Sequence, residues 1–166
     1  MKVFGLIGWK GSGKTYFAQK IIYSLTKKNI KVASIKRAHH DFDIDHPNTD
    51  SFLHRMSGSS QVIVSSSKRW VKITELLDSP EQTLDELIKK LDETDIVIVE
   101  GFKKSSHPKI EVIDNPSDDS QFMFNKHYKN IVGIISNTKI DSFQKKQFKK
   151  NEIDEIVEFI LNYKNE

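Results

Sequence analysis

A loop near the amino terminus has the residue types and the spacing that bind phosphate. Residues 8–15 read Gly-Trp-Lys-Gly-Ser-Gly-Lys-Thr, a complete G-x-x-x-x-G-K-[ST] loop. Its glycines let successive backbone N–H groups point at phosphate oxygens, and the start of a following helix adds partial positive charge. Lys14 can reach the terminal phosphates, and the Thr15 hydroxyl can bind Mg²⁺. The loop therefore predicts a site for a magnesium-bound nucleoside triphosphate.

The sequence on both sides of the loop supplies the context that this motif requires. Residues 3–7 are an apolar run that predicts a strand, and residues 15–28 carry apolar side chains at helical spacing. We expect Lys14 to be catalytic in any phosphoryl transfer. We expect the nucleotide to be bound by backbone amides, with the Lys14 side chain on the terminal phosphates and the Thr15 side chain on the metal. The residues that supply these amides are Trp9, Lys10, Gly11, Ser12, Gly13, Lys14 and Thr15.

A second part of the site is predicted at Glu100, which follows the apolar run 96–99 and precedes Gly101. In proteins with this loop, an acid at the end of a neighbouring strand approaches Mg²⁺, usually through water. We therefore expect Glu100 to be a catalytic carboxylate that assists the metal or orients a water. The alternative is an acidic residue at an exposed strand end that has no partner.

The segment 36–51 gathers three histidines and four aspartates in sixteen positions. It follows the next predicted strand, so it begins near the edge of the sheet where open α/β folds bind ligands. In one interpretation Lys36 binds phosphate, and Asp45 or Asp50 joins Thr15 and Glu100 at the metal. In a second, imidazoles and carboxylates form a transition-metal site. A solvated polar loop is the third.

The order of the predicted elements indicates the fold class. Strands alternate with helices, and several strands are apolar on both faces, which favours an α/β fold: a three-layer α/β/α sandwich resembling P-loop NTPases. The sheet is expected to be mostly parallel, with an antiparallel extension at its edge from residues 61–64 and 70–73. No linker divides the chain, so we expect one nucleotide-binding domain over residues 1–166. The lysines between 145 and 150 are expected on a solvated helix face.

Composition restricts the possible classes of function. The 166 residues include no cysteine and carry a formal charge of +3, with basic and acidic residues interspersed. Disulfides and thiolate metal sites are therefore excluded, and nucleic acid is not an expected partner. No apolar stretch is long enough to span a membrane, and we see no signal peptide, so we expect a cytoplasmic protein with no membrane partner.

Further motifs follow the phosphate-binding loop in a characteristic order. They are Ile-Lys at 35–36 leading to His-His-Asp-Phe-Asp at 39–43, then Asp45, Pro47, Asp50-Ser51, Ser-Lys-Arg-Trp at 67–70, Val-Glu-Gly-Phe-Lys at 99–103 and Pro-Lys-Ile-Glu at 108–111. From about Gly8 to Glu111 the sequence resembles the molybdopterin-guanine dinucleotide biosynthesis protein B (MobB) family. The resemblance implies a GTP-binding homodimer with weak GTPase activity. Such a protein assists, as an adaptor, the guanylyltransferase that attaches GMP to molybdopterin, and molybdopterin or its protein carriers are further implied partners.

The chain departs from the family's pattern at three places. It has Lys-Arg-Ala-His-His at 36–40 where the family often has Lys-His-Thr-His-His, and Pro-Asn-Thr-Asp-Ser at 47–51 where it often has Pro-Gly-Lys-Asp-Ser. After the strand predicted at 131–135, Asn137 and Asp141 could read a guanine edge, but their spacing is not Asn-Lys-x-Asp. The preference for guanine therefore rests on the resemblance alone.

Other functions remain open on the residues themselves. A small-molecule kinase would need an arginine-rich lid, and residues 114–129 contain no arginine. A nucleotide-gated metallochaperone would use the histidines, and a binding module would hold its nucleotide only for structure. An arginine for hydrolysis is not fixed by sequence, and the candidates are Arg37, Arg55 and Arg69.

Overall fold

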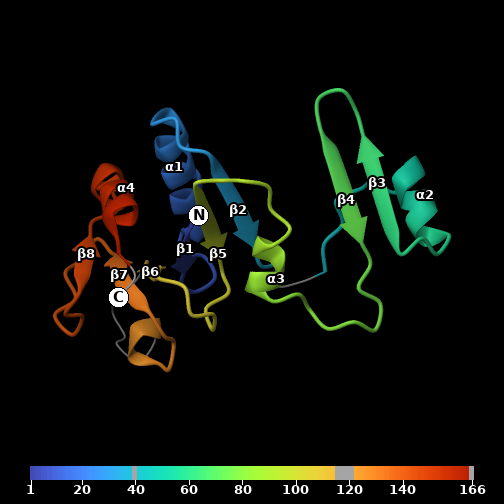
Figure 1. The fold of residues 1–166 in the computed structure, drawn as a ribbon. Helices are drawn as coiled ribbons and strands as arrows, with labels where there is room; N and C mark the ends of the chain where they lie inside the picture. The colour runs from blue at the N-terminus through green and yellow to red at the C-terminus, as the bar shows by residue number, and fades with distance from the viewer. Residues whose placement is uncertain (39–40, 115–121, 165–166) are drawn as a thin grey trace. The chain divides into compact units, whose positions relative to one another are not determined.

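The computed structural model describes residues 1–38, 41–114 and 122–164, and the chain forms two compact units. The first unit comprises residues 1–37 and 84–166, and the second comprises residues 38–83. Figure 1 shows the elements of both units along the chain. Each unit has its own sheet. The expectation of one domain stays a prediction.

The first unit is built on a six-stranded sheet in the order β2-β5-β1-β6-β7-β8, and every neighbouring pair of strands is parallel. Parallel strands place their carboxyl ends at one edge of the sheet, so the segments that follow β2, β5, β1, β6, β7 and β8 begin at that edge. The strands are β1 (Lys2–Ile7), β2 (Val32–Lys36), β5 (Ile96–Glu100), β6 (Lys109–Val112), β7 (Ile131–Ile135) and β8 (Lys146–Phe148).

Both faces of this sheet are covered, which explains why its central strands read as continuous apolar runs. On one face, Phe4 and Leu6 pack into a core with helices α1 (Lys14–Lys27) and α4 (Ile153–Asn162). On the other face, Val97 and Val99 pack against α3 (Leu84–Ile88), while β7 packs with the short 3₁₀ helix η2 (Met123–Asn125). The expected three-layer α/β sandwich is confirmed.

The second unit consists of helix α2 (Asp50–Met56) and an antiparallel hairpin of β3 (Gln61–Ser65) and β4 (Trp70–Thr74). The hairpin was expected as an antiparallel extension of the main sheet, and it forms a two-stranded sheet of its own. Its register pairs Val62 with Ile73 and Ile63 with Lys72, so the two pairs point to opposite faces. Helix α2 packs against β3.

One expectation about secondary structure needs correction. The lysines near residues 145–150 do not lie on a helix, because Lys146–Phe148 is the edge strand β8, with Lys146 exposed and Phe148 buried. A strand of three residues is too short for its alternation of exposed and buried side chains to be recognised in the sequence. Helix α3 begins at Leu84, four residues after Pro80. Among the described residues, no helix has the length and apolar character needed to cross a bilayer.

Candidate functional site

The backbone between β1 and α1 forms an open cradle. Gly11 and Gly13 have φ values of +82° and +93°, a left-handed conformation that glycine adopts without strain. Gly8 lies so close to the end of β6 that a Cβ there would be 2.5 Å from the carbonyl oxygen of Val112. Gly13 is the N-cap of α1, and no described side chain caps this helix end. The positive end of a 14-residue helix therefore faces the cradle without a protein partner.

Ser12 adds an unsatisfied polar atom to the cradle. Its residue is only 6% exposed, and its buried Oγ has no hydrogen-bond partner among the described residues. Buried hydroxyl groups are rarely left unpaired, because the lost hydration is not replaced. An oxygen-rich ligand in the cradle would satisfy this group, so the orphaned atom fits the phosphate-binding prediction.

The ammonium group of Lys14 lies over the loop itself. Its Nζ donates to the carbonyl oxygens of Gly8 at 3.0 Å and Trp9 at 2.7 Å. Burial lowers the pKa of Lys14; the nearby Glu100 opposes this shift, and the charges of Lys36 and Lys103 add to it. The three lysines around the cradle create a positive electrostatic potential, which favours the binding of an anion.

The predicted Glu100 lies at this cradle. The Thr15 hydroxyl donates to its Oε1 at 2.9 Å, and the Lys36 ammonium is 3.3 Å from the same oxygen. Strand pairing accounts for the meeting, because β5 lies between β1 and β2, with Leu6 and Lys36 both in register with Glu100. Lys36 is also 3.4 Å from the Thr15 hydroxyl oxygen. The Thr15 and Glu100 oxygens therefore already lie on either side of the Lys36 ammonium group, at the point where the sequence predicts Mg²⁺.

The remaining predicted binding residues of the loop lie at its surface. Lys10 is exposed, and Trp9 is 43% exposed. The Lys126 and Lys103 ammonium groups are 4.7 Å and 5.3 Å from the centre of the Trp9 ring, within the range of a cation–π contact. The sequence assigned no role to Lys126, and it included Lys103 only as part of the Val-Glu-Gly-Phe-Lys motif.

The two aspartates predicted at the metal, Asp45 and Asp50, belong to the second unit. The Arg55 guanidinium binds both carboxylate oxygens of Asp45, at 2.8 Å and 3.3 Å, and lowers the pKa of that carboxyl. Arg55 also pairs with Asp43 and Glu75, each at 2.8 Å. Asp45 is thus engaged within its own unit, Asp50 begins α2 at the surface, and their metal roles stay predictions.

The transition-metal interpretation has no preassembled ligand set in the described part of the chain, where no three histidines or carboxylates group closely enough to hold an ion. Two of the histidines on which it depends, His39 and His40, lie outside the described residues.

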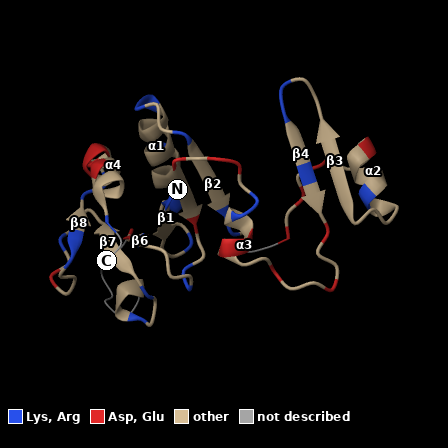
Figure 2. Ribbon diagram, in the orientation of Figure 1, with Lys and Arg blue, Asp and Glu red and all other residues tan. Residues whose placement is uncertain are grey.

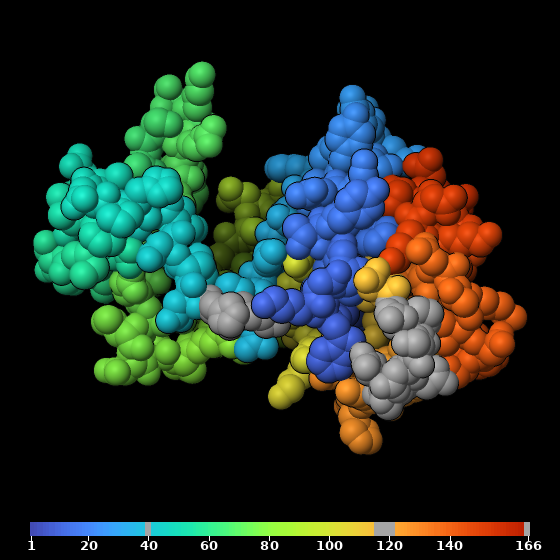
Figure 3. Space-filling view, turned by 180° about the vertical axis from the view of Figure 1, so that it is seen from behind, coloured from blue at the N-terminus to red at the C-terminus, as the bar shows by residue number. Residues whose placement is uncertain are grey.

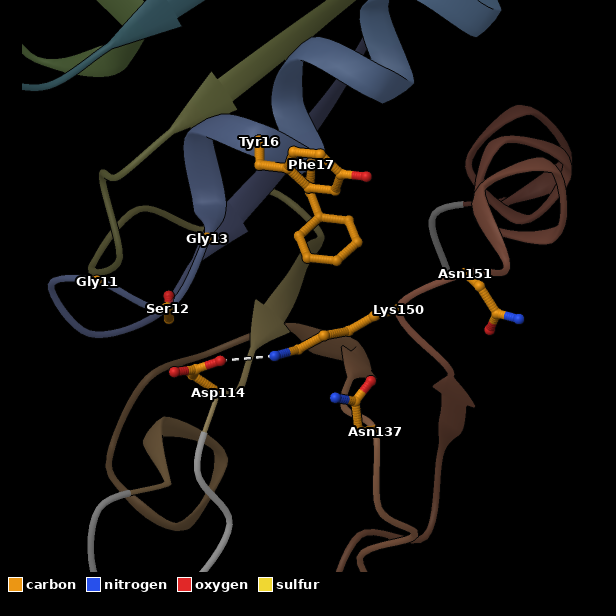
Figure 4. A pocket seen from close by; sticks show the side chains of 9 residues that line it. All are labelled: Gly11, Ser12, Gly13, Tyr16, Phe17, Asp114, Asn137, Lys150 and Asn151. Carbon is orange, nitrogen blue, oxygen red and sulfur yellow. Dashed lines mark hydrogen bonds and ion pairs between the residues drawn. The ribbon is translucent and has the colours of Figure 1, made fainter.

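A cavity of about 470 Å³ adjoins the cradle (Figure 4). Gly11, Ser12 and Gly13 line it together with Tyr16 and Phe17 of α1. Its other walls are residues that follow three neighbouring strands, namely Asp114 after β6, Asn137 after β7, and Lys150 and Asn151 after β8. Of these residues, the sequence indicated a binding role only for Asn137; Lys150 was expected on a helix face because the short strand β8 could not be recognised.

Comparison with known proteins identifies the family. The family model described as MobB, molybdopterin guanine dinucleotide synthesis protein B, matches residues 3–137. The molybdopterin-guanine dinucleotide biosynthesis adapter proteins of Escherichia coli and Haemophilus influenzae are each 40% identical, over 104 and 111 residues. These alignments cover 61% and 65% of this chain.

The chain spans about three fifths of the length of these relatives, 59% and 61% respectively. A crystal structure of molybdopterin-guanine biosynthesis protein B superposes with a TM-score of 0.76 at 25% identity, and the match covers 96% of this chain and 97% of that one. The resemblance read from the motifs is confirmed: the chain belongs to the MobB family.

Proposed function

We propose that this protein binds Mg·GTP and acts as an adapter in the synthesis of the molybdopterin guanine dinucleotide cofactor. The observation that carries the proposal is the 2.9 Å contact between Thr15 and Glu100 beside Lys14, at the mouth of a glycine cradle. This arrangement suits the charged tail of a nucleoside triphosphate and a divalent cation together. The adapter role rests on the relatives, which are named as adapter proteins of this biosynthesis.

The residues around Thr15 fit Mg²⁺ in charge and in ligand type. Hydroxyl and carboxylate oxygens are hard ligands of the kind that Mg²⁺ prefers. The Thr15 hydroxyl uses its proton toward Glu100, which leaves its lone pairs for a metal. Mg²⁺ bound there would neutralise charge on the phosphates, while Lys14 turns from the loop carbonyls to the terminal phosphates. The Lys36 side chain is 60% exposed, so it can move away from Glu100 when Mg²⁺ binds.

Hydrolysis by the isolated protein should be slow. Rapid phosphoryl transfer in this fold uses an arginine that stabilises the transition state. Of the three candidates, Arg55 is engaged by Asp43, Asp45 and Glu75 in its own unit. Arg37 and Arg69 remain candidates within the chain, and an arginine of a partner protein, such as the guanylyltransferase, is the other source of this positive charge. Molybdopterin or its carriers are the other partners we propose, in a cytoplasmic setting without nucleic acid or membrane.

We also propose a homodimer, formed through the second unit. Large apolar side chains that are normally buried lie exposed there, and scattered single residues would not explain so many in 46 residues of chain. A second copy of the same surface would cover them in a symmetric interface. They are Phe42, Ile44, Leu53, Met56, Ile63, Val64, Trp70, Leu76 and Leu77.

Two measurements test the proposal. Trp9 and Trp70 are the two tryptophans of the chain, so a Trp70→Phe background isolates the fluorescence of the loop. Saturating Mg·GTP should change this signal, and the protein should raise the yield of dinucleotide cofactor from a guanylyltransferase supplied with molybdopterin and limiting GTP. A silent Trp9 signal together with an unchanged yield would contradict the proposal.

A further inference from the structure

We propose that the cavity beside α1 holds the base and ribose of the nucleotide, and that Asp114 and Lys150 read the base as guanine. This inference rests on the proposed function, because it extends the same site from the phosphates to the base. Figure 4 shows the Lys150 side chain reaching Asp114 across the cavity, with Asn137 also at its wall.

The cavity is continuous with the phosphate cradle. Its lining includes Gly11, Ser12 and Gly13, the residues whose backbone was predicted to bind phosphate. A volume of about 470 Å³ lies within the range of small-molecule sites. A nucleotide held by its phosphates at the loop would therefore place its sugar and base in this space. The orphaned Ser12 Oγ offers a hydrogen-bonding partner on that path.

The topology separates the charges of the site into two groups. Strand β1 lies inside the sheet, and the metal-side residues Glu100 and Lys36 come from β5 and β2 on one side of it. The cavity residues follow β6, β7 and β8 on the other side. Ligands in open α/β sheets bind at the carboxyl ends of strands, on both sides of such a central loop. The base end of the nucleotide is thus assigned to the β6–β8 side.

The ion pair between Asp114 and Lys150 has the pattern that a guanine edge requires. The Lys150 Nζ lies 2.6 Å from Asp114 Oδ1, which sets an acceptor-only group beside a donor-only group. Guanine presents O6 as an acceptor next to the N1–H and N2–H donors. The carboxylate can accept from both donors while the ammonium donates to O6. Adenine has an amino donor where guanine has O6, and it has the acceptor N1 and a C2–H where guanine has its two donors, so it matches neither the ammonium nor the carboxylate.

The same two side chains neutralise each other when no base is present. The Asp114 side chain is 62% exposed while that of Lys150 is 26% exposed. Neither charge is deeply buried, so the pair can open toward a base at small cost. The phenol ring of Tyr16 and the ring of Phe17, in edge-to-face contact at 5.3 Å, give the cavity an aromatic wall for a planar base.

The test compares ligands that differ at one position of the base. The dissociation constants of GTP, ITP, XTP and ATP are measured by titration calorimetry with the full chain, alongside inorganic tripolyphosphate. ITP lacks the N2 amine, and XTP has an oxygen there. We expect GTP to bind roughly tenfold or more tightly than ITP or ATP, the usual worth of a lost base-edge contact. Equal binding of GTP, ITP and ATP by the native protein would overturn the inference.

Asp114→Asn gives the decisive comparison, because an amide can donate to the oxygen at position 2 of xanthine. This variant should lose about 10- to 100-fold in GTP affinity, lose the preference for GTP over ITP and gain affinity for XTP. Lys150→Met should lower the affinity for GTP, and Lys149→Met, at the exposed neighbouring position, should leave it unchanged. If the Asp114→Asn protein ranks the nucleotides by affinity in the same order as the native protein, the assignment is contradicted.

Tripolyphosphate separates this inference from the proposed function. It should bind the native protein and every cavity variant with similar affinity, since it uses the loop alone. If tripolyphosphate binds but the nucleotide bases are not distinguished, the base assignment fails and the phosphate site stands. If neither tripolyphosphate nor any nucleotide binds, the proposed function fails and the base assignment fails with it.

Discussion

The two units of the chain are stabilised in different ways. The first unit covers both faces of its sheet with helices and buries its central strands almost completely. In the second unit, Val62 is the one large apolar residue that is buried among those described, and Arg55 binds three carboxylates. A unit of this size buries too little apolar surface to be strongly stable alone. The first unit can present a preformed site, whereas the second needs an additional surface to cover it.

This comparison predicts that a change in the loop affects binding but not folding. In Lys14→Ala, the affinity for Mg·GTP should fall about 100-fold or more, because charge-assisted hydrogen bonds to phosphate are lost. Stability should stay unchanged or rise slightly, since the burial that lowers the pKa of Lys14 disfavours its charge in the folded protein. Calorimetry with nucleotide and thermal unfolding measure the two effects. Lys27→Ala, at an exposed position in the last turn of α1, is the control, and a Lys14→Ala protein that retains native affinity would refute the assignment.

A change in the second unit should do the reverse, by altering assembly but not nucleotide affinity. Ile63 is exposed and lies opposite Lys72 on the free face of the hairpin, so Ile63→Lys puts a second positive charge on that face. Burying one isoleucine contributes about 2 kcal/mol, and a symmetric dimer loses two. The dissociation constant of the dimer should therefore rise about 100-fold or more, as measured by sedimentation or light scattering. Tyr23→Lys, which changes an exposed aromatic of α1 instead, should leave assembly unchanged. A native protein that is monomeric at micromolar concentration would rule out the dimer itself.

The sequence predicted most about the first unit, where signals are local. A contiguous loop fixes Lys14 and Thr15, and a buried parallel strand that ends in an acid brings Glu100 to them through ordinary strand pairing. Apart from Asn137, the outer walls of the cavity escaped prediction, because Asp114 and Lys150 follow two other strands, one of which is only three residues long. Their proximity depends on the order of strands in the sheet, which a single sequence does not state.

In the second unit, the types of element were predictable and the partners of the side chains were not. Asp45 could be named as a metal ligand because carboxylates in polar loops often bind metals, yet Arg55, ten residues along, takes both of its oxygens. The Pro-Lys-Ile-Glu motif at 108–111 shows a similar limit in the first unit. Lys109 is fully buried and donates to three backbone carbonyls, and Glu111 accepts from the backbone N–H groups of Met123 and Phe124. This motif organises the fold, although its charges suggest chemistry.

The first unit should also have an acid-sensitive point at His107. Burial, with a smaller contribution from Lys109, lowers the pKa of His107 to about 4 from its ordinary value of 6.5. The unfolded chain binds a proton at this site below pH 6.5 and the folded chain only near pH 4, so stability falls as the pH decreases between these values. The loss should be about 1 to 2 kcal/mol between pH 7 and pH 5. Denaturant unfolding at both pH values measures it, and His107→Phe, a ring that does not titrate, should lose less stability than the native protein over the same interval. An identical loss in both proteins would exclude His107 as the cause.

The smallest expected effect concerns the ion cluster of the second unit. Arg55→Met removes the partner of Asp43, Asp45 and Glu75 at once, and leaves three carboxylates to repel one another. Local opening of residues 38–83 should then become more frequent, and limited proteolysis should cleave this segment several-fold faster, while nucleotide affinity changes little. Arg69→Met, an exposed substitution in the β3–β4 turn, controls for the loss of a positive charge. Arg55→Met could instead abolish GTP hydrolysis without speeding proteolytic cleavage. The Arg55 guanidinium would then act in the reaction and not in stabilising the second unit, and the proposed difference in stability between the two units would be wrong.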